Sequence, residues 1–149
     1  MKKYIRSEYE VYSSLSYGDE DIKRYVIKEG IKQFGNAFHP ITDYMSRRDY
    51  LDYLNSMDIL VMYHNRQQAF GNIMTAIVLG MPVFMKTISP VYAMAKQVGI
   101  SSVYGVGELV NIDIRNAIAR TKSDRDINSS IVASIFLEET RLEYLRQML

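Results

Sequence analysis

The sequence predicts an α/β protein with a doubly wound, mainly parallel sheet of about five or six strands. The chain has 149 residues, a length that suits one hydrophobic core. Strand-like and helix-like segments alternate about five times, which is typical of this class. The clearest strand-like runs are apolar throughout, as expected when helices cover both faces of a sheet. We place this domain in residues 1–122, followed by an amphipathic helix over 123–149 that packs on the domain or on a partner.

The first four elements are expected before residue 58. Residues 9–16 are rich in β-prone types, and Asp19 beyond them is suited to cap a helix that ends near Gly35. A short strand is expected over residues 36–41. Ser46 then precedes a second helix, whose apolar residues recur at helical spacing.

The clearest strand is the apolar run 58–63, which we expect to be buried on both faces. The pattern beyond it predicts, in order, a helix over 71–79 capped by Gly80, a strand over 82–85, a helix over 90–98, a strand over 101–104 and a helix over 112–120. The stretch 124–149 is expected to form one long helix or two with a kink, and its apolar face carries Ile127, Ile131, Ile135, Leu142, Leu145 and Leu149.

Composition excludes several function classes. There is no cysteine, so disulfides, iron–sulfur clusters and thiol nucleophiles are excluded. The net charge is +1 without a basic block, so nucleic acid is not an expected partner. No metal or cofactor is expected, because the Asp-x-Asp triplets at 19–21 and 124–126 are typical of helix starts. The opening residues do not form a signal peptide, and the apolar stretch 73–85 is too short to span a bilayer.

The segment from His64 to Asn72, HNRQQAFGN, carries most of the functional information. It follows a predicted strand and opens a helix, which is where open α/β sheets bind ligands and where helix N–H groups attract phosphate. Arg66 can bind a diphosphate through two hydrogen bonds, and Gly71 lets backbone approach a ligand closely. The side chains of Gln67, Gln68 and Asn72 add further donors. A solvated surface loop is the alternative interpretation.

Two further loops are candidates. Ser16 and Gly18 follow the first strand, and a plain turn capped by Asp19 is as good an interpretation of them as a phosphate-binding loop. The run 38–41 could pack against a base, but a core Phe38 and a surface His39 are the better interpretation.

The run HNRQQAFGNIMTAIVLGMPVFM, with SYGD before it and the RRDYLDYL helix between, resembles the bacterial 4-acetamido-4,6-dideoxygalactosyl (Fuc4NAc) transferases. These enzymes extend lipid II in the synthesis of enterobacterial common antigen. The resemblance covers about residues 11–110 and corresponds to the carboxyl-terminal, donor-binding half of the two-domain GT-B architecture, whose domains are Rossmann-like. The resemblance implies an acceptor-binding half before this one, and we expect that half to lie outside the 149 residues.

The resemblance implies a metal-independent hexosyltransferase that uses a nucleotide-activated sugar, with dTDP as the expected nucleotide. It implies a lipid-linked saccharide acceptor and a cytoplasmic location peripheral to the inner membrane. The implied diphosphate or sugar contacts are Arg66, Gln67, Gln68, Gly71 and Asn72, with His64 in the same segment and Ser16 and Gly18 in the phosphate loop. One departure is Thr75, which stands where many GT-B enzymes have a glutamate for the ribose hydroxyls.

The catalytic base is not identified, and we expect it in the other half of the enzyme. This chain alone would then bind nucleotide and transfer little or no sugar. The alternative is a non-catalytic doubly wound module that binds an anion or nucleotide and acts through a partner. Ile131, Ile135 and Leu142 could also support a homodimer through the last helix.

Replacing Arg66 by alanine is expected to weaken binding of a dTDP-type ligand well beyond the effect of Arg47→Ala. The reason is that Arg66 follows the strand at the predicted site, whereas Arg47 opens a helix elsewhere. Isothermal titration calorimetry of both variants measures the difference. Equal titrations would contradict the assignment of Arg66.

Overall fold

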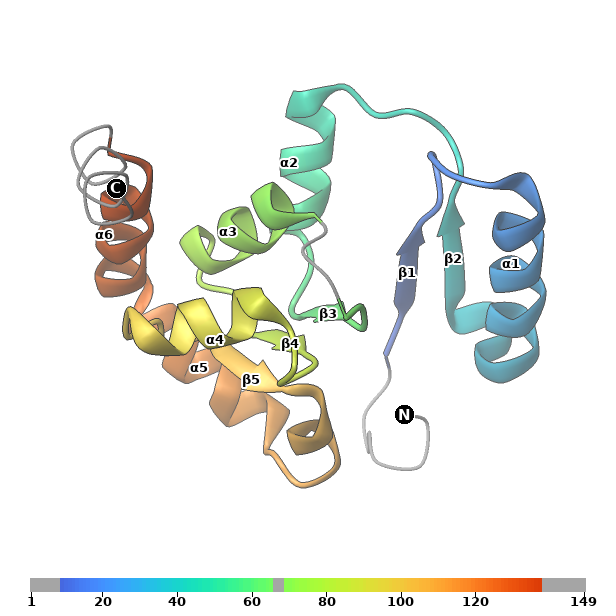
Figure 1. The fold of residues 1–149 in the computed structure, drawn as a ribbon. Coiled ribbons are helices and arrows are strands. Elements are labelled where there is room, and N and C mark those ends of the chain that lie inside the picture. The colour runs from blue at the N-terminus through green and yellow to red at the C-terminus, as the bar shows by residue number, and fades with distance from the viewer. Residues whose placement is uncertain (1–8, 66–68, 138–149) are drawn as a thin grey trace. The chain divides into compact units, whose positions relative to one another are not determined.

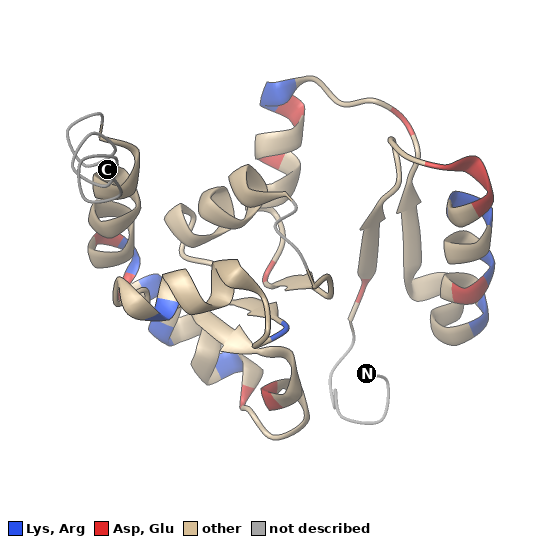
Figure 2. Ribbon diagram, viewed as in Figure 1, with Lys and Arg blue, Asp and Glu red and all other residues tan. Residues whose placement is uncertain are grey.

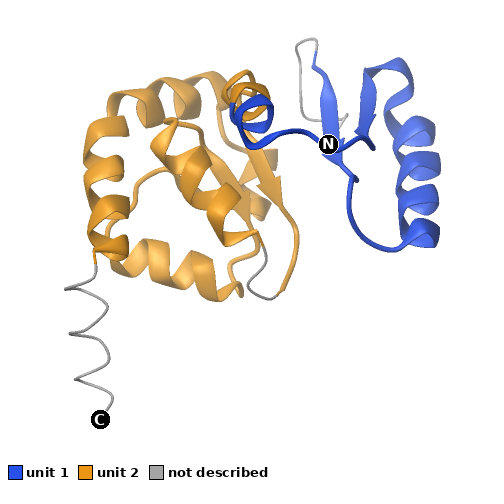
Figure 3. Cartoon of the chain, turned by 90° about the horizontal axis from the view of Figure 1, so that it is seen from above, with its two compact units in different colours: residues 1–51 blue, residues 52–149 orange. Residues whose placement is uncertain are grey.

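The computed structural model describes residues 9–65 and 69–137, and the chain divides into two compact units, 1–51 and 52–149 (Figures 1 and 3). The predicted α/β class is confirmed, because every described strand pair is parallel and helices connect the strands. The described strands form two sheets, of two and three strands, where the sequence predicts one sheet of five or six. Apolar patterns locate strands but do not specify which backbones pair, so the number of sheets was not predictable from them.

Unit 1 is a β-α-β unit. It contains β1 (Val11–Ser14), α1 (Glu20–Phe34), a 3₁₀ turn (Gly35–Ala37) and β2 (Phe38–Ile41), with β1 parallel to β2. The predicted cap is confirmed, because the Asp19 carboxylate accepts hydrogen bonds from the backbone N–H groups of Asp21 and Ile22 at 2.8 and 3.1 Å. A Cβ added at Gly30 would overlap the Phe38 ring, so glycine lets α1 lie directly on β2.

Helix α2 (Arg47–Asn55) begins in unit 1 and ends in unit 2. Its predicted start is confirmed, since the Ser46 hydroxyl accepts a hydrogen bond from the Asp49 N–H at 3.2 Å and donates one to the Asp49 carboxylate at 2.7 Å. This reciprocal cap satisfies a donor that a helix start otherwise leaves unpaired.

Unit 2 holds a three-stranded parallel sheet in the order β3-β4-β5. Its elements are β3 (Leu60–Met62), α3 (Phe70–Val78), β4 (Val83–Met85), α4 (Pro90–Gln97), β5 (Val103–Gly105), a 3₁₀ turn (Val106–Val110), α5 (Ile114–Ser123) and α6 (Arg125–Phe136). These agree with the predicted elements to within a few residues. Gly80 ends α3 as predicted, with φ of 76°, and the next residue, Met81, donates its N–H to the Ala76 carbonyl at 2.9 Å.

The core of unit 2 is centred on β4, all of whose residues are buried. The expectation that the strand within 58–63 is buried on both faces is wrong, because Val61 of β3 is 36% exposed. The physical reason is position: β3 lies at the edge of its sheet and has one strand neighbour, whereas β4 has two.

The described part of the predicted last helix is α6, which packs against α3. Its buried residues are Asn128 and Val132, whereas Ile127, predicted on the apolar face, is 65% exposed. Ile131 and Ile135 of the predicted face are half-buried, and the side chains that contact α3 include Arg125, Ser129 and Phe136. Leu142, Leu145 and Leu149 lie outside the described residues. No helix in the described ranges has both the length and the apolar character needed to cross a membrane.

Tyr104 of β5 is a core residue whose ionisation affects the stability of the fold at alkaline pH. Its ring stacks on Phe84 of β4 with centroids 5.2 Å apart, and its buried hydroxyl has no hydrogen-bond partner among the described residues. Burial raises the pKa of Tyr104 above the ordinary 10.0. Burial also raises the pKa of Tyr50, and a hydrogen bond with Ser14 partly offsets that rise.

A raised folded-state pKa means that the unfolded phenol ionises first as pH rises. The contribution of Tyr104 to the free energy of unfolding is therefore expected to be constant below pH 10 and to fall above it. Tyr104→Phe should reduce this alkaline loss and should raise neutral-pH stability by about 1 kcal/mol, because it removes a buried unpaired hydroxyl. Urea unfolding between neutral and alkaline pH, with the exposed Tyr17→Phe as control, measures both effects. An unchanged alkaline slope in Tyr104→Phe would refute this role.

Candidate functional site

The candidate site of unit 2 is the edge of the β3-β4-β5 sheet where the three strands end. Parallel strands end at the same edge, and open α/β sheets bind ligands there. Tyr63, His64 and Asn65 follow β3, Lys86 follows β4, and a 3₁₀ turn follows β5. We call this the carboxyl edge.

Lys86 provides the positive charge of the carboxyl edge. Its Nζ donates a hydrogen bond to the Asn65 side-chain oxygen at 2.8 Å and lies 4.1 Å from the centre of the Tyr63 ring. Among the described residues no carboxylate forms an ion pair with it. Two contacts therefore fix the ammonium while its charge and further N–H donors remain available to an anion.

His64 lies beside Asn65 and has unsatisfied polar atoms. Both ring nitrogens are buried, and neither has a hydrogen-bond partner among the described residues. A buried polar atom left unpaired costs about 1–3 kcal/mol. A ligand that hydrogen-bonds to the ring would remove that cost, so His64 is suited to contact a ligand.

Helix α3 begins at the carboxyl edge without a side-chain cap. Its first backbone N–H groups have no partner within the helix, so they can bind an anion. Gly71 is exposed, and a Cβ added there would meet nothing within 4 Å, so a ligand can approach the backbone. Asn72, one residue on, is half-buried. Figure 2 shows that no charged residue lies on α3, so the helix start is not neutralised by its own side chains.

Ala69, the residue before α3, has a left-handed backbone with φ of 51° and ψ of 35°. It is the only described residue other than glycine with a positive φ. For an L-residue this conformation costs about 1–2 kcal/mol. Such strain is found at ligand-binding turns, where it holds the chain in a required path.

The turn after β5 places a carboxylate at the carboxyl edge. A Glu108 carboxylate oxygen accepts a hydrogen bond from the Gly105 N–H at 2.6 Å. A Cβ at Gly105 would be 3.2 Å from that oxygen and 3.0 Å from the Thr87 methyl, so a larger residue would require these side chains to shift. The stretch 105–110, which begins like a dinucleotide-binding motif, is a strand end and a 3₁₀ turn.

The predicted site residues fall into three groups. His64, Gly71 and Asn72 lie together at the carboxyl edge of unit 2, and Arg66, Gln67 and Gln68 lie outside the described residues. Ser16 and Gly18 lie in unit 1, in the turn between β1 and α1, where Gly18 is exposed with φ of 111°. They stay predicted phosphate contacts.

Two other sequence expectations can be placed. The Thr75 hydroxyl donates its proton to the Gly71 carbonyl at 2.8 Å, so it is not free to donate to a ribose. Phe38 is a core residue, as expected, while His39 bonds to the Glu10 carboxylate and stacks on Tyr12. Among the described residues no three His, Asp or Glu side chains gather in a way that could hold a metal.

Sequence reasoning missed Lys86, the charged residue of the carboxyl edge. The signal was present, because Lys86 directly follows the predicted strand 82–85 and strand ends gather at one edge of a parallel sheet. Its contact with Asn65 joins residues 21 apart in sequence, which no local pattern shows.

Ala69→Gly tests the strained turn. The substitution relieves the left-handed strain and adds backbone entropy to the unfolded chain, so we expect the free energy of unfolding to stay unchanged or to rise by up to about 1 kcal/mol. The same change in a regular helix, at exposed Ala93 of α4, should lower it by about 1 kcal/mol. Urea unfolding compares the two, and equal losses would mean that Ala69 is unstrained.

Comparisons of the chain with protein-family models, with curated proteins and with solved structures find no match. The Fuc4NAc transferase resemblance therefore stays a prediction from the sequence motif. Gly71 and Asn72 of that motif lie at the carboxyl edge, and the Arg-Gln-Gln part lies outside the described residues.

Proposed function

We propose that the chain is the donor-binding half of a glycosyltransferase, and that the carboxyl edge of unit 2 holds the diphosphate of a nucleotide sugar. The observation that carries this proposal is the Lys86 ammonium, held by Asn65 and Tyr63 without a carboxylate partner among the described residues. Two further features add support: among the described residues the His64 ring has no hydrogen-bond partner, and no described side chain caps α3. Assignment to the GT-B carboxyl-terminal domain is part of the same proposal.

In this function, the bond between sugar and diphosphate breaks as an acceptor hydroxyl attacks the sugar. Negative charge then builds on the departing diphosphate. A fixed ammonium and helix N–H groups stabilise that charge without rearranging, and one such donor is worth about 2.7–4 kcal/mol in the transition state. Lys86 and the first N–H groups of α3 have this role.

The sugar, the acceptor and the membrane belong to the proposal through the resemblance alone. We propose an acetamido-dideoxyhexose carried on dTDP and a lipid-linked saccharide as acceptor. The base that deprotonates the acceptor is proposed to come from a separate acceptor domain, so this chain alone binds nucleotide and transfers little sugar.

The second candidate is a non-catalytic module that binds an anion or nucleotide, which the same Lys86 contacts and α3 start would also serve. The effect of the sugar on nucleotide affinity distinguishes the two functions. A donor domain is expected to bind a dTDP-hexose more tightly than dTDP, whereas a module that recognises only the nucleotide is expected to bind the two equally.

Lys86→Met tests the proposed function. We expect it to weaken dTDP binding about 10- to 100-fold, because a hydrogen bond to a charged group is worth about 1.5–3 kcal/mol. A thermal-shift panel of dTDP, UDP, GDP and CMP first identifies the nucleotide, and calorimetry then measures its affinity. The exposed Lys28→Met on α1 makes the same chemical change away from the edge and should bind like the wild type. Absence of binding by all four nucleotides would reject the function.

A further inference from the structure

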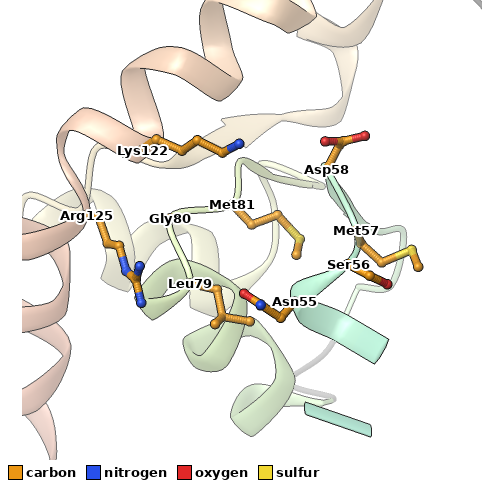
Figure 4. A pocket seen from close by; sticks show the side chains of 9 residues that line it. All are labelled: Asn55, Ser56, Met57, Asp58, Leu79, Gly80, Met81, Lys122 and Arg125. Carbon is orange, nitrogen blue, oxygen red and sulfur yellow. The ribbon is translucent and has the colours of Figure 1, made fainter. Parts of the chain in front are cut away.

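A cavity lies in unit 2 at the edge of the sheet opposite the carboxyl edge, where β3 and β4 begin (Figure 4). Its volume is about 390 Å³, within the ~300–1,000 Å³ typical of small-molecule sites. The ends of α2 and α3, the last turn of α5 and the first residue of α6 surround it. None of its lining residues belongs to the carboxyl edge, so it is a separate candidate site.

Two cations line this cavity. Lys122 and Arg125 form no ion pair with any described carboxylate, whereas Arg120, nearby on α5, pairs with Asp124. Figure 4 shows both side chains on the side of the cavity formed by α5 and α6. Neither positive charge is therefore neutralised by a described carboxylate.

Arg125 is held in place before any ligand arrives. Its Nε donates a hydrogen bond to the Val78 carbonyl at the end of α3, at 3.0 Å. A Cβ added at Gly80 would lie 3.4 Å from the Arg125 Cβ, so the two segments pack closely. The hydrogen bond uses Nε and leaves the terminal guanidinium nitrogens free to donate, which lowers the entropy cost of binding.

The other side of the cavity has different chemistry. Asp58 and the Asn55 carboxamide line it, and neither side chain has a hydrogen-bond partner among the described residues. Both can accept hydrogen bonds from hydroxyl groups. Leu79 and Met81 lie between the two sides and supply apolar surface (Figure 4).

We propose that this cavity binds a small phosphorylated sugar. A phosphate monoester carries close to two negative charges at neutral pH, which match Lys122 and Arg125. Sugar hydroxyls donate to Asp58 and Asn55, and the C–H face of the ring packs on Leu79 and Met81. A free carboxylate or inorganic phosphate would bind only to Lys122 and Arg125. It would leave Asp58 and Asn55 without hydrogen-bond partners.

Calorimetry on the full chain with glucose 6-phosphate, glucose 1-phosphate, fructose 6-phosphate, inorganic phosphate and glucose tests this site. We expect at least one sugar phosphate to bind about tenfold or more tightly than inorganic phosphate, and glucose not to bind. Lys122→Met should weaken the sugar phosphate about tenfold or more, since it removes one charged partner. Lys28→Met is the matched control and should bind normally.

Asp58→Asn tests the proposed hydrogen bonds from the sugar hydroxyls to Asp58. It should lower affinity for the sugar phosphate while leaving inorganic phosphate unchanged or tighter. Failure of all three sugar phosphates to bind, or equal binding by Lys122→Met and wild type, would overturn the proposal. The site is independent of the proposed function, because Lys122→Met is expected to leave dTDP binding unchanged. Displacement of the sugar phosphate by dTDP would show one shared site and would also overturn it.

Discussion

Parallel pairing of β4 with both of its neighbours is the constraint on which the arrangement of unit 2 depends. β4 is wholly buried and hydrogen-bonded to β3 on one side and β5 on the other. Parallel strands need crossover connections, which α3 and α4 provide. Each crossover helix brings the chain back to the edge where the next strand begins. Strand ends and helix starts therefore lie at the carboxyl edge, and helix ends lie at the opposite edge.

The two edges of the sheet differ in the sign of charge that the helix dipoles stabilise. Helix C-termini favour cations, so the fold itself gives Lys122, in the last turn of α5, part of its stabilisation. Lys86 lies at the edge where α3 begins, and a helix start repels a cation. Helix dipoles therefore do not stabilise Lys86, and its ammonium contacts the Asn65 side chain and the Tyr63 ring.

Much of the fold could be predicted because its signals are local. Asp19, Ser46 and Gly80 cap helices through bonds to residues a few positions away, and each was predicted from residue type and spacing. Burial was harder, because it depends on neighbours distant in sequence. Val61 is as apolar as the residues of β4 yet is exposed, since β3 is an edge strand. Asn128 of α6 is buried and bonds to Ser101, whereas the apolar Ile127 beside it is exposed.

The sequence by itself determined the order of the elements, their caps and the placement of His64, Gly71 and Asn72 at a strand-to-helix junction. These depend on hydrogen bonds and side-chain periodicity within one or two turns of chain. Only the tertiary structure decided that the described strands form two sheets, that Lys86 meets Asn65, and that Lys122 and Arg125 share a cavity with Asp58. The physical reason is that such contacts join segments far apart in sequence, and the packing of the whole unit selects them.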